Sequence, residues 1–204
     1  MVTKKKRAAK PAKAKKPEKP LVQLATAKAF RAWLAKHHES SDGIWLQLAK
    51  KGSELSSPTY AEALDVALCF GWIDGQKGAI DAHSWKQMFT RRGPRSIWSK
   101  INREHVARLI ASGEMTKHGL AEVEKARANG QWERAYDSPK NATLAEDFQT
   151  ALAANPQAKA FFATLNAANR YAISFRIQNA KKPETRLRKV SELVAMLARG
   201  ERLH

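Results

Sequence analysis

Residues 69–103 read CFGWIDGQKGAIDAHSWKQMFTRRGPRSIWSKINR, and this stretch decides the fold that we expect. Residues 72–75 have the pattern of a short strand that enters a turn, and residues 85–91 alternate as a second strand. Ser96 is then placed to cap a helix that Gly113 ends. Two strands joined by a turn and followed by a capped helix predict a sheet packed by helices.

Aromatic and basic side chains are interleaved along this stretch. It holds three tryptophans, two phenylalanines and seven Lys or Arg residues, against two carboxylates, Asp74 and Asp81. Such a mixture is typical of a surface that holds an anionic or planar ligand. Trp72 and Trp85 are expected to belong to the core rather than to the ligand surface.

The rest of the chain extends this pattern. Residues 44–49 alternate as a half-buried strand, and capping residues predict helix starts at Thr26, Ser57, Thr116 and Asn155. The C-terminal third is helical in pattern throughout. We therefore predict an α+β fold that is mostly helical, with a small antiparallel sheet packed by helices and a C-terminal helical region. The expected divisions are a tail over 1–20, a core domain over 21–137 and the helical region over 138–204.

The chain of 204 residues carries a net charge of +18, and the charge is uneven. Residues 1–20 hold nine Lys or Arg and one Glu in a Lys/Ala/Pro-rich sequence, which predicts a disordered tail. This tail is a candidate for non-specific nucleic-acid contact through its lysines, or a solubilising segment. Residues 21–204 are basic as well, with 28 Lys or Arg against 18 Asp or Glu.

Several classes of protein are not indicated. No run approaches the roughly 20 apolar residues of a membrane span, so we expect a cytoplasmic protein without such a span. Cys69 is the lone cysteine and ends an apolar helix, so we expect a buried structural thiol. The six histidines show no HExxH or two-His-one-carboxylate spacing, and no phosphate loop or nucleophile motif occurs. We therefore predict no metal, no cofactor and no catalytic residues.

The candidate binding site lies where the second strand gives way to the helix. Arginine forks before a helix N-terminus suit a phosphate or carboxylate, because free backbone N–H groups there add positive charge. Asp74 is the natural counter-ion, and the aromatic rings are placed to stack on a ring or base. The alternative is a solvated loop beside a core tryptophan. The candidate residues are Asp74, Phe89, Arg91, Arg92, Arg95, Ser96, Trp98, Ser99, Lys100 and Asn102.

The ordered motifs of the chain resemble one known family. The stretch YAEALDVALCFGWIDG, the segment KQMFTRRGPRSIWSKINREHVARLI and the closing KKPETRLRKVSELVAMLARGER are similar to the bacteriocin-protection, YdeI/OmpD-associated (OmdA) family. The resemblance covers residues 24–202 and leaves out the basic tail. It implies a small cytoplasmic-type protein linked by name to protection against bacteriocins and to an outer-membrane porin. It carries over no catalytic residue and no cofactor.

Three hypotheses about function follow. The first is a non-enzymatic protein of the stress-protection or bacteriocin-protection type, whose basic and aromatic pocket takes an anionic small molecule or a protein partner. Direct sequestration of cationic peptides is disfavoured, because a chain of charge +18 repels them. The second is a nucleic-acid-binding protein that uses the basic tail and body. The third is an enzyme that pairs Asp74 with Arg91 or Arg92.

Overall fold

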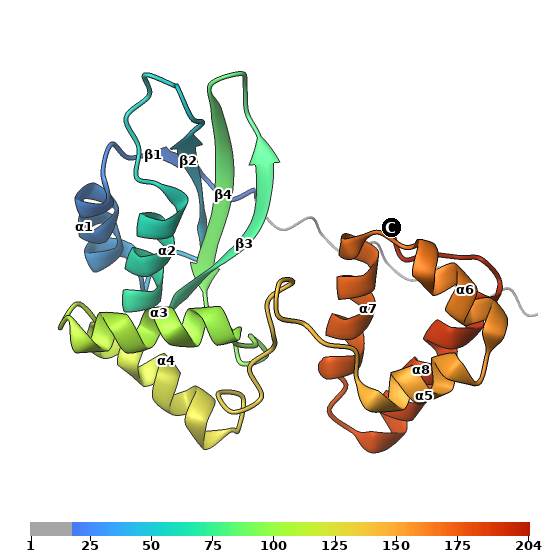
Figure 1. The fold of residues 1–204 in the computed structure, drawn as a ribbon. Helices are drawn as coiled ribbons and strands as arrows, with labels where there is room; N and C mark the ends of the chain where they lie inside the picture. Colours follow the sequence, from blue (N-terminus) through green and yellow to red (C-terminus); the bar gives the residue numbers. More distant parts are fainter. Residues whose placement is uncertain (1–17) are drawn as a thin grey trace, which may run out of the picture.

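The computed structural model describes residues 18–204, and it confirms the α+β class with a small sheet packed by helices (Figure 1). Most of the predicted tail over 1–20, namely residues 1–17, lies outside the described residues, while Lys19 Nζ donates to the Asp42 carbonyl at 2.6 Å. The elements of the first part are β1 (Leu21–Gln23), α1 (Ala27–His37), β2 (Ile44–Ala49), α2 (Tyr60–Cys69), β3 (Trp72–Ala79), β4 (Ser84–Arg91), α3 (Lys100–Ala111) and α4 (Lys117–Ala128). Those of the second part are α5 (Glu146–Ala153), α6 (Pro156–Thr164), α7 (Ala167–Gln178) and α8 (Pro183–Ala198).

The sheet has the order β1-β2-β4-β3 and is mixed rather than wholly antiparallel. The three longer strands pair antiparallel, as predicted. The correction comes from β1, which pairs parallel with β2. Helix α1 lies between these two strands in the sequence and carries the chain back to the starting edge, and such a crossover produces a parallel pair.

One face of the sheet forms the core of the first part. In β2, Ile44, Leu46 and Leu48 are fully or almost fully buried, while the residues between them are half-buried. Alternation of this kind places every second side chain on the covered face. Phe89 of β4 is fully buried on Phe30 of α1, with ring centroids 5.5 Å apart. The core therefore lies between the sheet and the helices beside it (Figure 1).

The helix starts confirm three of the predicted caps and correct two. Thr26, Thr116 and Asn155 are N-caps. The second helix is capped by Thr59 rather than Ser57, because Thr59 and Glu62 form a capping box that satisfies two free donors. The third helix is capped by Ser99 rather than Ser96.

The correction at Ser96 has a local cause. The Ser96 hydroxyl accepts from the Gly93 backbone N–H at 2.9 Å, and the Ser96 N–H donates to the Gly93 carbonyl. This closes a turn three residues ahead of the helix. Ser99 then accepts from the Asn102 N–H at 3.1 Å and starts α3 at Lys100. The helix N-terminus therefore lies beyond the arginines rather than beside them.

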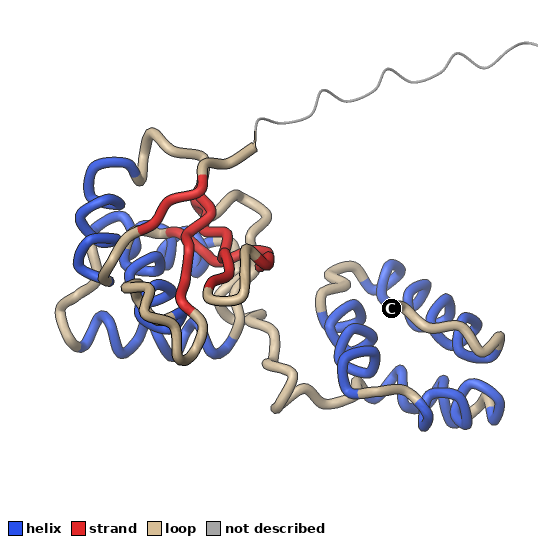
Figure 2. Tube along the Cα trace, turned by 90° about the horizontal axis from the view of Figure 1, so that it is seen from above, coloured by secondary structure: helices blue, strands red, loops and turns tan. Residues whose placement is uncertain are grey.

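The buried apolar residues form two separate groups. The first group runs from Phe30 to Ala135, and the second from Phe148 to Leu197. Helix α8 contacts α5, α6 and α7, so it forms the centre of the second group. Figure 2 shows the two parts joined by the segment that leads from α4 to α5. Tyr136 of that segment meets Phe175 of α7 edge to face, with ring centroids 5.0 Å apart.

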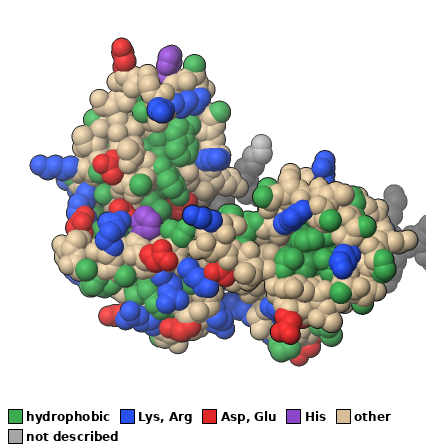
Figure 3. Space-filling model, viewed as in Figure 1, with side chains coloured by type: hydrophobic (Ala, Val, Ile, Leu, Met, Phe, Trp, Pro, Cys, Tyr) green, Lys and Arg blue, Asp and Glu red, His purple; other side chains and the backbone are tan. Residues whose placement is uncertain are grey.

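Two surface properties bear on function. Among residues 18–204, each helix is too short or too polar to cross a membrane. On the face in view, lysines and arginines are spread over both parts, with acidic side chains among them (Figure 3).

Candidate functional site

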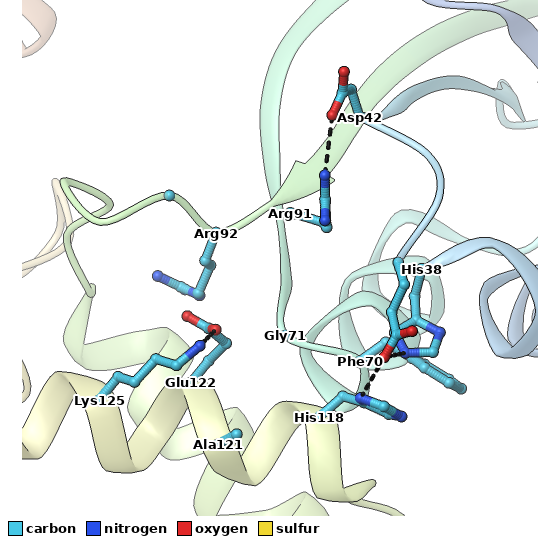
Figure 4. Close-up of a pocket in the computed structure, with 12 residues that line it drawn as sticks. His38, Asp42, Phe70, Gly71, Arg91, Arg92, His118, Ala121, Glu122 and Lys125 are labelled. Atoms are coloured by element: carbon cyan, nitrogen blue, oxygen red, sulfur yellow. Dashed lines mark hydrogen bonds and ion pairs between the residues drawn. The ribbon is translucent and has the colours of Figure 1, made fainter.

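A cavity of about 530 Å³ opens where α1 ends, where β4 ends and along α4. Figure 4 shows its side chains in three groups: the Arg91–Asp42 pair, the Arg92–Glu122–Lys125 group, and the two histidines His38 and His118. A second cavity of about 480 Å³ lies on the other side of Arg92. Four residues line both cavities, namely Arg92, Gly93, Glu122 and Lys125.

The close docking of α4 against α2 creates this corner. A Cβ on Gly119 would lie 2.5 Å from the Cys69 carbonyl oxygen, so only glycine allows the two helices to approach so closely. Gly71 ends α2 with φ of 72°, a conformation that favours glycine. Its carbonyl accepts from the Arg92 N–H at 3.1 Å. These contacts bring the end of β4 against α4.

Arg92 is the most unusual side chain in the corner, because it is charged and only 8% exposed. Its guanidinium lies over the Trp98 ring, with 3.4 Å between Cζ and the ring centroid. Nη1 donates to the Ile97 carbonyl at 3.2 Å, while Nε and Nη2 are buried without a hydrogen-bond partner. Burial lowers the pKa of Arg92 to about 10, which still leaves it charged at neutral pH.

The acidic neighbours of Arg92 do not neutralise it by direct contact. Glu122, Tyr136 and Asp74 lie close enough to oppose the lowering of its pKa. Figure 4 shows the Arg92 guanidinium pointing toward Glu122. The Glu122 carboxylate, however, accepts from Lys125 Nζ at 2.7 Å. Arg92 therefore keeps a desolvated positive charge with one edge unpaired.

The other predicted cations lie in different surroundings. Arg91 Nη2 lies 3.0 Å from Asp42 Oδ1. Lys100, the first residue of α3, lies 2.7 Å from Asp137 and holds the pKa of that carboxyl below its usual range. Arg95 is exposed and lines neither cavity. The predicted basic cluster is thus divided among separate contacts.

The remaining predicted site residues are divided among several places in the first part. Phe89 is in the core, and Ser99 and Asn102 form the cap of α3. Asp74 accepts from the Tyr60 hydroxyl at 2.8 Å, and together with burial this raises the pKa of Tyr60. Ser96 and Trp98 line the second cavity beside Arg92. Of the ten candidates, the structure brings Arg91 and Arg92 to the first cavity, and Arg92, Ser96 and Trp98 to the second.

The residues predicted to lie in the core differ in burial. Trp72 is fully buried, while Trp85 is half-buried against the core. Cys69 is a buried free thiol, as predicted, and burial raises its pKa. The enzyme hypothesis pairs Asp74 with Arg91 or Arg92. In the structure Asp74 bonds Tyr60 and Arg91 pairs with Asp42.

Sequence reasoning missed a cluster of two histidines and one carboxylate. His38 and Glu39 follow α1, and His118 is the second residue of α4. One ligand atom from each lies within 4.8 Å of the others. Burial and the neighbouring His38 lower the pKa of His118. No spacing rule finds this set, because Glu39 and His118 lie 79 positions apart and only the docking of α4 joins them.

Comparison with known families divides the chain into two segments. Residues 22–122 match a domain of unknown function (DUF8412), and residues 141–200 match the family described as bacteriocin-protection, YdeI or OmpD-associated. No curated protein and no solved structure shows significant similarity to the chain. The WIDG motif and the arginine corner thus fall in the first segment, and the closing helix falls in the second. Residues 141–200 therefore match the bacteriocin-protection, YdeI or OmpD-associated family, in agreement with the resemblance in this part of the chain.

Proposed function

We propose that the protein is a non-enzymatic binding protein of the bacteriocin-protection type, and that Arg92 holds one anionic group of its ligand. The observation that carries this proposal is the buried Arg92 guanidinium, whose Nε and Nη2 have no partner. Buried donors in folded proteins are nearly always hydrogen-bonded, so two unpaired donors on one side chain call for a partner.

The chemistry of the unpaired edge selects the anionic group. Nε–H and Nη2–H point in parallel from the same edge of the guanidinium. A carboxylate or a phosphate presents two oxygens that match this edge in a bidentate pair. The guanidinium lies against the face of the Trp98 ring, so its Nε–H and Nη2–H donors are held in place before a ligand binds.

The ligand is expected to carry one anionic group rather than many. Arg91 and Lys125 each contact a carboxylate, Asp42 and Glu122, whereas Arg92 has two buried donors without a partner. Two cavities of about 530 and 480 Å³ adjoin it, which is room for a small molecule. A polyanion would instead need several free cations in a row.

Binding requires a movement of side chains at the cavity wall, because Nε and Nη2 are shielded from water. The Lys125 side chain is 68% exposed and lines both cavities, so it is a part of the wall that can move. An outward movement of this side chain would widen the space in front of Arg92. We also propose that the protein is cytoplasmic. The reducing conditions there keep the lone Cys69 thiol free.

Calorimetric titration with inorganic phosphate and with phenyl phosphate tests this function. Arg92→Met is expected to weaken binding about tenfold or more, because a hydrogen bond to a charged group contributes about 1.5–3 kcal/mol. Arg95→Ala is the matched control: it removes an exposed arginine of the same loop that lines neither cavity. Equal weakening by both variants would mean unspecific attraction and would contradict the proposal.

A second candidate function is nucleic-acid binding through the basic tail. Nine Lys or Arg against one Glu among residues 1–20 favour it. Its affinity for duplex DNA should fall steeply as salt rises, since each neutralised phosphate releases a counterion. Replacement of Lys4, Lys5 and Lys6 by Gln should reduce the slope of log affinity against log salt by about 3. An unchanged slope would remove the tail from this role.

A further inference from the structure

The cluster of His38, Glu39 and His118 has the composition of a metal site. It offers two imidazoles and one carboxylate at the wall of the first cavity. Glu39 Oε1 lies 3.5 Å from His38 Nε2 and 3.7 Å from His118 Nδ1. These separations exceed those of ordinary hydrogen bonds, so the three groups lie close together without satisfying one another.

The separations fit a metal ion placed between the groups. Bonds of about 2.0–2.1 Å to nitrogen and oxygen, at tetrahedral angles, put neighbouring ligand atoms roughly 3.3 Å apart. The observed distances of 3.5 and 3.7 Å lie a few tenths of an ångström beyond that value. The Glu39 side chain is 78% exposed, so it can close this gap without moving the core.

A hydrogen bond to the backbone sets the orientation of the His38 ring. Its Nδ1 lies 2.9 Å from the Leu34 carbonyl oxygen, which accepts the Nδ1 proton. In the neutral ring the Nδ1 proton makes this bond, so the lone pair is on Nε2, which lies 3.5 Å from Glu39 Oε1. A hydrogen bond of this kind from the non-ligating nitrogen is the usual support of a metal-bound histidine. Nε2 itself is buried and has no hydrogen-bond partner.

We propose that His38 Nε2, Glu39 Oε1 and a ring nitrogen of His118 bind one divalent transition metal of the Zn²⁺ class. Imidazole and carboxylate together suit Zn²⁺, Co²⁺ and Ni²⁺, whereas Ca²⁺ and Mg²⁺ demand mainly oxygen ligands. Three protein ligands leave at least one coordination position, and the ligand residues line the cavity, so that position opens into it. The inference does not rest on the Arg92 proposal, because Arg92 is not among the ligands.

The test is a titration of the full, untagged chain with Co²⁺, followed by visible absorption, and with Zn²⁺ by calorimetry. We expect one equivalent to bind, with the d–d bands of a tetrahedral Co²⁺ ion. His118→Ala and Glu39→Gln change residues at the surface of the corner, and each should weaken binding about tenfold or more.

His37→Ala is the matched control, since His37 adjoins the site in sequence but lies against Trp33, with ring centroids 4.7 Å apart. It should leave Co²⁺ binding unchanged, and so should Arg92→Met, which separates this inference from the anion site. Tryptophan fluorescence checks that every variant is folded. The proposal is overturned if the wild type binds no stoichiometric metal, or if His118→Ala binds as tightly as His37→Ala.

Discussion

The two parts of the molecule treat their buried polar groups differently. In the C-terminal helices, the buried Asn169 side chain donates to Asn166 and accepts from the His204 N–H at 3.1 Å. In the first part, Arg92 Nε and Nη2 and His38 Nε2 are buried without partners, and all the unpaired buried side-chain atoms found among residues 18–204 belong to these two residues. Buried polar atoms without a partner lower the stability of the fold unless a bound ligand supplies the missing hydrogen bonds. The contrast supports the proposal that a ligand binds in the first part.

This contrast separates the family name from the site. The bacteriocin-protection match covers residues 141–200, whose core is apolar and closely packed. Both cavities beside Arg92 and the histidine cluster lie within 38–131, mostly in the segment that matches the domain of unknown function. The segment that matches this family therefore carries neither of the two proposed sites.

The largest expected effect tests whether the two cores are independent. Phe148 is fully buried and meets Phe162 edge to face. Phe148→Ala should destabilise the C-terminal helices by about 3–5 kcal/mol, because it leaves a cavity. All six tryptophans lie between residues 33 and 132, so their fluorescence reports on the first part alone. In urea, the far-UV dichroism should show early loss of helix while the fluorescence transition stays in place. A parallel shift of both transitions would make the two parts one cooperative unit.

The next effect acts on the first part and on both sites. Gly119→Ala places a methyl group against the carbonyl oxygens of Cys69 and Leu68, which would lie 2.5 and 2.7 Å away. We expect a loss of about 1–3 kcal/mol, the usual cost of overpacking, only partly offset by the better helix propensity of alanine. The fluorescence transition should move to lower urea. Helix α4 must shift to make room, so both phosphate and Co²⁺ binding should weaken. A variant of wild-type stability would mean that the docking of α4 is loose.

Two matched changes test the contrast between satisfied and unsatisfied polar groups. Asn169→Ala should cost about 1–3 kcal/mol, because His204 and Asn166 lose a buried partner. Arg92→Met should stay within about 1 kcal/mol of the wild type. The substitution removes the stacking of Arg92 on Trp98, which destabilises the fold. It also removes a buried charge that makes only one hydrogen bond, which offsets that loss. Thermal unfolding measures both. A larger loss for Arg92→Met than for Asn169→Ala would reverse the contrast.

The smallest effect concerns the response of the C-terminal helices to acid. A hydrogen bond from Arg186 holds the pKa of Asp147 below its ordinary value. Its stabilisation is therefore complete above the unfolded-state pKa of about 3.9 and is lost as pH falls through the lower folded-state value. Both side chains are partly exposed, so the contribution is at most about 1 kcal/mol.

Asp147→Asn removes this contribution at every pH. The difference in stability between the wild type and this variant, followed by dichroism, should shrink to zero as the pH becomes strongly acidic. A difference that stays constant with pH would mean that the pair does not stabilise the fold.

Local sequence patterns were sufficient to predict features that depend on residues close together in the chain. Alternation over residues 44–49 predicted β2, and capping residues such as Thr26 and Thr116 predicted helix starts. The error at Ser96 arose because serine also closes turns, and only the bonds with Gly93 show which role it has. Short local rules cannot separate these two uses of one hydroxyl.

The candidate site was predictable only in part, because its geometry depends on a helix docked from elsewhere in the chain. The corner around Arg92 was found from its arginines and Trp98. Asp42 pairs with Arg91 and Asp137 pairs with Lys100, and both carboxylates come from distant parts of the sequence, so local patterns could not identify them. The histidine cluster was missed for the same reason, since the close approach at Gly119 brings His118 to His38.

The central claim is that the unpaired edge of Arg92 is the place where the ligand is held. The most direct measurement is the ¹⁵N–¹H signal of the Arg92 Nε–H group during titration with phenyl phosphate, assigned by its absence in Arg92→Met. We expect this signal to shift in a saturable way, with the same dissociation constant as the calorimetric titration, while the Arg95 Nε–H signal stays in place. Saturable binding that leaves the Arg92 signal unmoved would contradict the claim.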